Sequence, residues 1–208
     1  MRWLVVGAGG HARVVADAVS AAWPDAMIVG HLDDDPTKHG SLILGHAVLG
    51  PISSIDRWEH DAVALAIGDN RVRATLFDRL SASQRLPPVV HPRATVARSA
   101  SIGDASVLFA GAVVNAAAVV RENCIVNTAA TVDHDCVLGP HAHAGPGSHV
   151  NGGCVLGRGS FLTTGVVVGH HVRIGDWTVV GAGSVVLADL PPDVLAYGAP
   201  AQVARTLR

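Results

Sequence analysis

The sequence predicts two domains, a small α/β domain followed by an all-β parallel β-helix. Two observations support this prediction. An aliphatic residue recurs at every sixth position from Val90 to Val186, and before this series short apolar stretches alternate with helix-like ones. A period of six fits no α-helix, whose apolar positions recur every three or four residues. A repeat of this kind decides the fold, because each unit must bury its apolar side against its neighbours.

The first domain is expected over residues 1–85. Strands are expected at residues 3–6, 27–30 and 62–67, and helices at residues 13–21 and 72–80. This alternation predicts a small Rossmann-like parallel sheet, in which ligands bind at the carboxyl ends of the strands.

A glycine-rich loop follows the first expected strand, from Gly7 to Ala12, with the sequence Gly-Ala-Gly-Gly-His-Ala. It formally matches a dinucleotide-binding pattern, with Asp33 about 20 residues further on. A purely structural turn is a second interpretation. A third is a site for the phosphates of a nucleotide sugar, held by backbone N–H groups at a helix start. The shortness of this domain favours the nucleotide sugar over NAD, because a full dinucleotide fold is larger.

The second domain is expected over residues 86–208. Sixteen of the seventeen positions in its six-residue series are Val, Ile or Leu, and Ala144 is the exception. The residue two places before each is mostly small, and side chains alternate along a strand, so both point inward. Three units close a triangular coil of eighteen residues, so the series builds five to six coils without an inserted loop. Cys124, Cys136 and Cys154 occupy small inward positions and are expected to be buried thiols rather than disulfides or metal ligands.

Composition excludes several classes of protein. The formal net charge of −2 gives no electrostatic basis for binding nucleic acid. No apolar run reaches the roughly 18 residues of a transmembrane helix, so no membrane insertion is expected. Met1-Arg2 leads into a short strand rather than a signal peptide, and a cytoplasmic location is expected.

Several motifs together carry a family resemblance. They are the Gly-Ala-Gly-Gly-His opening, the Asp33-Asp34 pair, the segment 66–70 (Ala-Ile-Gly-Asp-Asn), His91-Pro92 before the repeats, and the ending Tyr197-Gly198-Ala199-Pro200. With these motifs the chain resembles the sialic-acid O-acetyltransferase (NeuD-like) family, which includes the PglD-like nucleotide-amino-sugar N-acetyltransferases. The resemblance implies a left-handed hexapeptide-repeat coil and a homotrimer with active sites between subunits.

The same resemblance implies an activity. An acetyl group would pass from acetyl-CoA to the amino group of a UDP-linked 4-amino-4,6-dideoxy sugar. The first domain would bind the nucleotide sugar and the β-helix would bind acetyl-CoA, with no metal.

The segment 132–136 (Val-Asp-His-Asp-Cys) contains the predicted catalytic pair. His134 lies two places after the inward Val132, at an exposed corner, with an acid on each side. A neutral imidazole can take the proton of an attacking amine, and a carboxylate can fix its tautomer. The resemblance aligns His134 with the family's general base and Asp135 with its orienting acid. A solvated corner histidine is the alternative.

The resemblance also implies binding residues. Those for the nucleotide sugar and acceptor are Gly9, Gly10, His11, Asp33, Asp34, Gly68, Asn70 and Asn127, and those for acetyl-CoA are His143, Thr164 and Ala182. His143 precedes the inward Ala144, so it should point outward. His134 and His143 are expected on the order of 10 Å or more apart in one chain, so a site that uses both needs a neighbouring subunit. His141 and His149 have no assigned role and are expected at the surface.

Three other functions stay open at this point. A sugar or sialic-acid O-acetyltransferase would use the same base and fold. A zinc enzyme of the γ-type carbonic anhydrase kind would draw ligands from coil edges, where His134 and His170 lie 36 residues apart with His171 adjacent, but zinc needs three protein ligands. A scaffold that only trimerises is the third.

Overall fold

The computed structural model describes residues 1–207 and contains two compact units, Met1–His91 and a repeat unit that begins at Pro92. This boundary was expected after Arg85. The structure places it later because Val89 and Val90 pack against the helix Gly10–Ala22 of the first unit. Neither helix of the described residues is long and apolar enough to cross a membrane.

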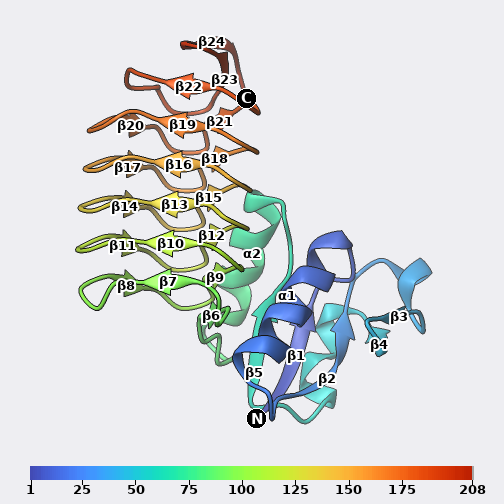
Figure 1. Ribbon diagram of the computed structural model, residues 1–208. Coiled ribbons are helices and arrows are strands. Elements are labelled where there is room, and N and C mark those ends of the chain that lie inside the picture. The colour runs from blue at the N-terminus through green and yellow to red at the C-terminus, as the bar shows by residue number, and fades with distance from the viewer. Residues whose placement is uncertain (208) are drawn as a thin grey trace. The chain divides into compact units, whose positions relative to one another are not determined.

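The first unit contains a five-stranded sheet with two α-helices (Figure 1). Its elements are β1 (Arg2–Val6), α1 (Gly10–Ala22), β2 (Met27–Leu32), the 3₁₀ turn η1 (Pro36–Lys38), β3 (Leu42–Ile43), β4 (His46–Gly50), the 3₁₀ turn η2 (Ile52–Arg57), β5 (Ala62–Leu65), α2 (Asn70–Leu80) and β6 (Val89–Val90). The strand order is β3-β4-β2-β1-β5, and every pair is parallel except β3–β4. The predicted parallel sheet is therefore confirmed.

Burial and capping explain these elements. After Arg2, β1 is apolar from Trp3 to Val6, because it lies between β2 and β5 in the sheet and these four residues are fully buried. α2 begins where the Asp69 carboxylate accepts the backbone N–H groups of Arg71 and Val72, both at 2.9 Å.

The hairpin β3–β4 was missed in the sequence analysis. Its two-residue turn is Leu44-Gly45, with φ of 49° and 86°. Both residues have positive φ, as in a type I′ turn, which usually carries Asn-Gly. Leucine at such a position gives no turn signal, so the hairpin could not be seen in the sequence.

The repeat unit is a stack of two-residue strands. They are β7 (Thr95–Val96), β8 (Ser101–Ile102), β9 (Val107–Leu108), β10 (Val113–Val114), β11 (Val119–Val120), β12 (Ile125–Val126), β13 (Thr131–Val132), β14 (Val137–Leu138), β15 (His143–Ala144), β16 (His149–Val150), β17 (Val155–Leu156), β18 (Phe161–Leu162), β19 (Val167–Val168), β20 (Arg173–Ile174), β21 (Val179–Val180) and β22 (Val185–Val186), followed by the longer β23 (Val194–Gly198) and β24 (Ala201–Thr206). Strands from β7 to β22 keep the six-residue spacing without a slip, as predicted.

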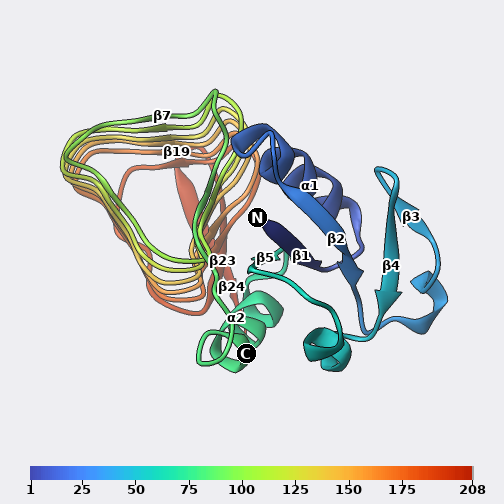
Figure 2. The same ribbon diagram turned by 90° about the horizontal axis from the view of Figure 1, so that it is seen from below.

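Each short strand pairs in parallel with the strand eighteen residues away, for example Val113 with Thr131 and Val119 with Val137. Three sheets result, which contain β7-β10-β13-β16-β19-β22, β8-β11-β14-β17-β20 and β9-β12-β15-β18-β21. Viewed along the stack, the coils superpose as a triangle (Figure 2). After the last coil β23 pairs with β21, and the antiparallel β24 turns back on β23. This terminal hairpin has no six-residue period, so the repeat analysis did not predict it.

The interior of the coil follows the predicted pattern. Val126, Val132 and Leu138 are fully buried, as are all three cysteines, which are free thiols. Burial raises the pKa of Cys136 to about 11, so this thiol stays protonated at neutral pH. The cysteines are therefore packing residues, as expected from their positions.

We predict that Leu138→Ala lowers the free energy of unfolding by about 2–5 kcal/mol, because it leaves a cavity between stacked coils. Leu187→Ala is the matched control, since Leu187 is 66% exposed and its truncation should change stability by less than about 0.5 kcal/mol. Urea denaturation of both variants tests this, and equal losses would contradict the assigned core.

Candidate functional site

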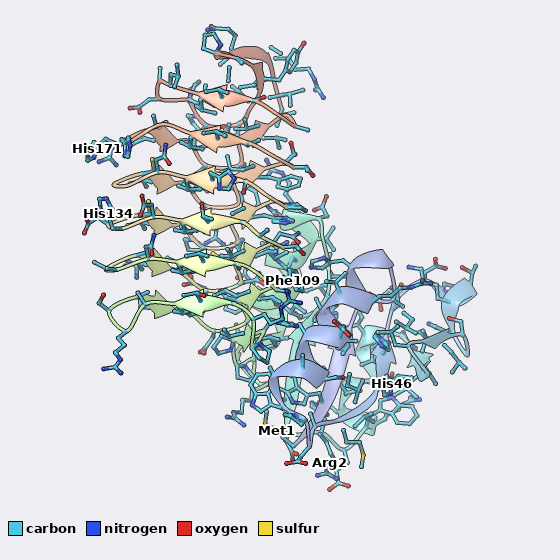
Figure 3. All side chains as sticks on the ribbon, in the orientation of Figure 1. Met1, Arg2, His46, Phe109, His134 and His171 are labelled. Atoms are coloured by element: carbon cyan, nitrogen blue, oxygen red, sulfur yellow. The ribbon has the colours of Figure 1, made fainter. Side chains whose placement is uncertain are left out.

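The predicted catalytic pair lies on the corner between β13 and β14. The Nδ1 atom of His134 is 2.8 Å from Oδ2 of Asp135, and the His134 backbone N–H donates to Oδ1 of Asp133 at 2.8 Å. The His134 side chain is 56% exposed, and in Figure 3 it projects from the same edge of the coil as His171. The structure thus places His134 at an open corner, as its distance from Val132 predicted.

The backbone of this corner is held on both sides. Asp135 has φ of 59°, a left-handed conformation that aspartate tolerates better than most residues. Its N–H donates to the Ala116 carbonyl of the preceding coil at 3.1 Å, and the Gly153 N–H donates to the His134 carbonyl at 3.0 Å. The two side chains therefore stand on a framework that is fixed by neighbouring coils.

Charge at the corner favours the protonated form of His134. The hydrogen bond to Asp135 and the negative charge of Asp133 raise the pKa of His134 above its ordinary value. The pKa of Asp133 is lowered because its carboxylate accepts the His134 N–H and the Asn115 side-chain amide. With its Nδ1 proton donated to Asp135, a neutral His134 presents Nε2 as a proton acceptor.

A second group of predicted residues surrounds His143 on β15. Nδ2 of Asn127 donates to Nε2 of His143 at 3.0 Å, while Oδ1 of Asn127 accepts the Thr128 N–H at 2.8 Å. The His143 ring stacks on Phe161, with ring centroids 4.5 Å apart and planes 20° apart. His143 was expected to point outward from mid-strand. His143 is nevertheless only 5% exposed, because Asn127 and Phe161 from neighbouring coils cover it.

Thr164 and Ala182 occupy equivalent corners after β18 and β21, one coil apart. The Gly183 N–H donates to the Thr164 carbonyl at 2.9 Å, and both Thr164 and Ala182 are exposed. Asn127 lies at the same corner after β12, so these residues and His143 share one edge of the triangle. His134 and Asp135 stand on the next edge, across the face formed by β10, β13, β16 and β19. One chain therefore does not bring His134 and His143 together.

In the first unit, the loop after β1 is tied to the ends of its neighbouring strands. Gly7 has φ of 121°, and a Cβ there would lie 2.6 Å from the Ala66 carbonyl oxygen, so glycine is required. A Cβ at Gly9 or Gly10 would meet nothing within 4 Å. These two predicted residues therefore leave the start of α1 open on one side.

The Asp33-Asp34 pair makes structural contacts after β2. The Asp33 carboxylate accepts the Ala8 N–H at 2.8 Å and pairs with the Lys38 ammonium at 3.1 Å. Asp34 accepts the Ile52 N–H at 2.8 Å. Asp33 thus holds the glycine-rich loop against β2, a positioning contact that the sequence pattern did not reveal.

A buried arginine at the end of β5 was also missed. Arg73 on α2 is 1% exposed, and its Nη1 donates to the carbonyls of Ile67 at 3.1 Å and Gly68 at 3.5 Å. Burial and the Arg73 charge lower the pKa of His11 to about 4. The burial of Arg73 could have been predicted from helical spacing. Arg73 lies three residues after Asn70, and both residues are buried on the inner face of α2. The predicted residues His11, Gly68 and Asn70 therefore surround an interior positive charge.

The remaining histidines divide into buried and exposed. The expectation that His141 lies at the surface is wrong, since it is 1% exposed, lies 2.8 Å from Asn123 Nδ2 and stacks near Trp177. Asn123 and His141 occupy equivalent left-handed corners of successive coils, and Trp177 occupies the equivalent corner two coils beyond His141. The Trp177 ring lies over the intervening Gly159, which has no side chain, and so reaches His141. His149 is exposed, as expected, and bonds to Thr131. Among residues 1–207, no group of three or more His, Cys, Asp or Glu side chains is arranged to hold a metal ion.

Known proteins match this chain along its full length. A single-residue variant of perosamine N-acetyltransferase from Caulobacter crescentus, solved with CoA and GDP-perosamine, is 36% identical with a TM-score of 0.92, over 99% of this chain and 97% of that chain. The model of the PglD N-terminal domain matches residues 2–80. The chain belongs to the PglD-like family of sugar N-acetyltransferases. The resemblance seen in its motifs is thereby confirmed.

Two further matches agree with this family. The acetyltransferase domain of PglB from Neisseria gonorrhoeae FA1090, solved with acetyl coenzyme A, has 36% identity and a TM-score of 0.90, over 98% of each chain. UDP-N-acetylbacillosamine N-acetyltransferase from Bacillus subtilis (strain 168) is 33% identical over 109 residues, which are 51% of this chain. The matched region spans about half of that relative, 50% of its length.

We predict that Asp135→Asn lowers the pKa of His134 toward its ordinary value, because the amide removes the negative hydrogen-bond acceptor at Nδ1. NMR titration of the His134 ring protons measures this shift. Asp176→Asn is a matched control, since Asp176 accepts the Arg158 N–H on another edge of the coil. A His134 titration unchanged by Asp135→Asn would contradict the pairing.

Proposed function

We propose that this protein transfers the acetyl group of acetyl-CoA to an amino group on a nucleotide-linked sugar, with His134 as general base and Asp135 as its orienting acid. The observation that carries the proposal is the 2.8 Å contact between His134 and Asp135 at an open corner. It occurs in a chain whose full-length relatives include a structure with CoA and GDP-perosamine bound.

The chemistry follows from the state of the imidazole. The neutral amine attacks the thioester carbonyl, so a carbon–nitrogen bond forms and the carbon–sulfur bond breaks. The amine loses its proton to Nε2 of His134, and CoA leaves as a thiolate. Asp135 stabilises the imidazolium that forms. No cysteine acts as a nucleophile, because the nearby Cys136 is buried and its thiol stays protonated.

We place the nucleotide sugar at the carboxyl ends of β1, β2 and β5. Support comes from the open backbone at Gly9 and Gly10, at the start of α1, and from the interior cation at Arg73. Backbone N–H groups at a helix start and a nearby positive charge both favour a diphosphate. We expect a nucleoside-diphosphate-linked amino sugar, since the matched relative from Bacillus subtilis bears a UDP-sugar name and the matched Caulobacter crescentus structure holds GDP-perosamine.

We place acetyl-CoA along the edge that carries Asn127, His143, Thr164 and Ala182. Thr164 and Ala182 are exposed along this edge, beside the covered His143. Since His134 stands on a different edge, we propose a homotrimer in which the His134 edge of one subunit faces the His143 edge of the next. Acetyl-CoA and nucleotide sugars are cytoplasmic metabolites, and we infer that the protein works in the cytoplasm.

We predict that purified protein releases CoA thiol from acetyl-CoA in the presence of one member of a panel of UDP-, dTDP- and GDP-linked 4-amino-4,6-dideoxy sugars. His134→Ala should lower kcat by about 10²–10⁴-fold, the usual scale for loss of a general base. His149→Ala is a control at an exposed histidine of the neighbouring coil. Release with sialic acid alone would assign O-acetylation, and normal turnover by His134→Ala would refute the mechanism.

We also predict that two impaired variants, His134→Ala and His143→Ala, rescue each other. Mixed trimers of His134→Ala and His143→Ala chains, formed by co-expression, should recover about a quarter of the wild-type sites. The reason is that each site draws the two histidines from different subunits, and random assembly brings intact copies together in about one interface in four. Activity of the mixed sample, compared with each variant alone, measures this. No recovery in confirmed mixed trimers would place both histidines in one subunit.

A further inference from the structure

We infer that Gly152 is a positioning residue whose missing side chain leaves the space in which the His134 imidazole lies. This inference rests on the proposed role of His134. Gly152 occupies the corner after β16, eighteen residues beyond His134, so the two residues are at equivalent positions of neighbouring coils. No motif in the sequence analysis singled it out.

The distances at this corner are short. A Cβ at Gly152 would lie 2.6 Å from Cε1, 2.7 Å from Nε2 and 3.2 Å from Nδ1 of His134. Distances below about 3 Å are far inside van der Waals contact, so a methyl group and the ring cannot both occupy this space. The edge of the imidazole that carries Nε2 therefore lies directly over the bare Cα of Gly152.

Three other glycines of the coil make room for its backbone instead. A Cβ at Gly103, Gly139 or Gly175 would meet backbone atoms of the next coil at 2.5, 2.9 and 2.3 Å. Gly153 lies against the His171 ring, but its φ of 71° already favours glycine for conformational reasons. Gly152 has neither constraint. Its φ lies outside the left-handed range, and the nearest atoms to its absent side chain all belong to the His134 ring.

This difference predicts the effect of an alanine at position 152 on the His134 ring. The His134 side chain is 56% exposed, so the ring can swing outward without disturbing the core. The swing would separate Nδ1 from Asp135 and move Nε2 away from the position at which it accepts a proton. A displacement of about 1 Å in a catalytic group can lower the rate by about 100-fold. The fold should be unaffected while the base is misplaced.

The test is a double-mutant cycle with Gly152→Ala and His134→Ala. Gly152→Ala alone should lower kcat by about 10–100-fold, with KM for acetyl-CoA and the thermal midpoint nearly unchanged. In the His134→Ala background the same substitution should have no further effect, because it acts only through the ring. NMR titration should also show the pKa of His134 lowered toward its ordinary value, since the ring leaves Asp135.

Gly169→Ala is the matched control. Gly169 lies on the same edge one coil further on, and its Cβ would meet the Val186 carbonyl oxygen at 3.3 Å and Leu187 at 3.5 Å, not the His134 ring. It should leave kcat and the His134 titration unchanged. Wild-type turnover and titration by Gly152→Ala would overturn the inference, as would a further loss of rate in the His134→Ala background. A fully active His134→Ala protein would instead refute the proposed function itself.

Discussion

Backbone hydrogen bonds between residues one coil apart set the position of every side chain in the repeat unit. The Asp133 N–H donates to the Val150 carbonyl at 2.9 Å, and the Gly153 N–H donates to the His134 carbonyl at 3.0 Å. Each such bond contributes only about 1 kcal/mol net, but the series repeats through all coils. Residues eighteen apart therefore lie one above another, and a side chain at a corner has a known neighbour on either side.

This stacking of coils determines the geometry of the candidate active site. His134 and Asp135 point from a corner whose backbone cannot shift without breaking bonds to the coils on both sides. Asn127 reaches His143 because their strands are adjacent in one sheet, and the same sheet places Thr164 and Ala182 in line with them. A rigid scaffold of this kind suits acetyl transfer, in which an amine, a thioester carbon and a base must be aligned.

The repeat unit could be predicted far better than the first unit, for a physical reason. A residue's position within the six-residue repeat determines whether its side chain points inward. The burial of Val132 and Cys136 and the exposure of His134 could therefore be predicted from their positions in the repeat. The Leu44-Gly45 turn has no such signal, because it adopts positive φ without the usual asparagine. The burial of His141 depends on Trp177, a residue 36 positions away, and Asp33 proved to hold a loop although its spacing suggested a ligand contact. These are properties of packing between distant residues, which a local pattern does not record.

Counting residues along this coil also measures rotation about its axis. Six residues carry the chain from one edge to the next, a third of a turn, and eighteen residues return it to the same edge one level higher. An insertion of six residues between Asn127 and His134 would keep the core pattern intact and yet move His134 to the third edge. An insertion of eighteen would keep its edge and change only its height. Insertions that leave the core pattern intact can therefore still change the geometry of the site. The spacing of seven positions between Asn127 and His134 fixes the angle about the coil axis between the two halves of the proposed chemistry.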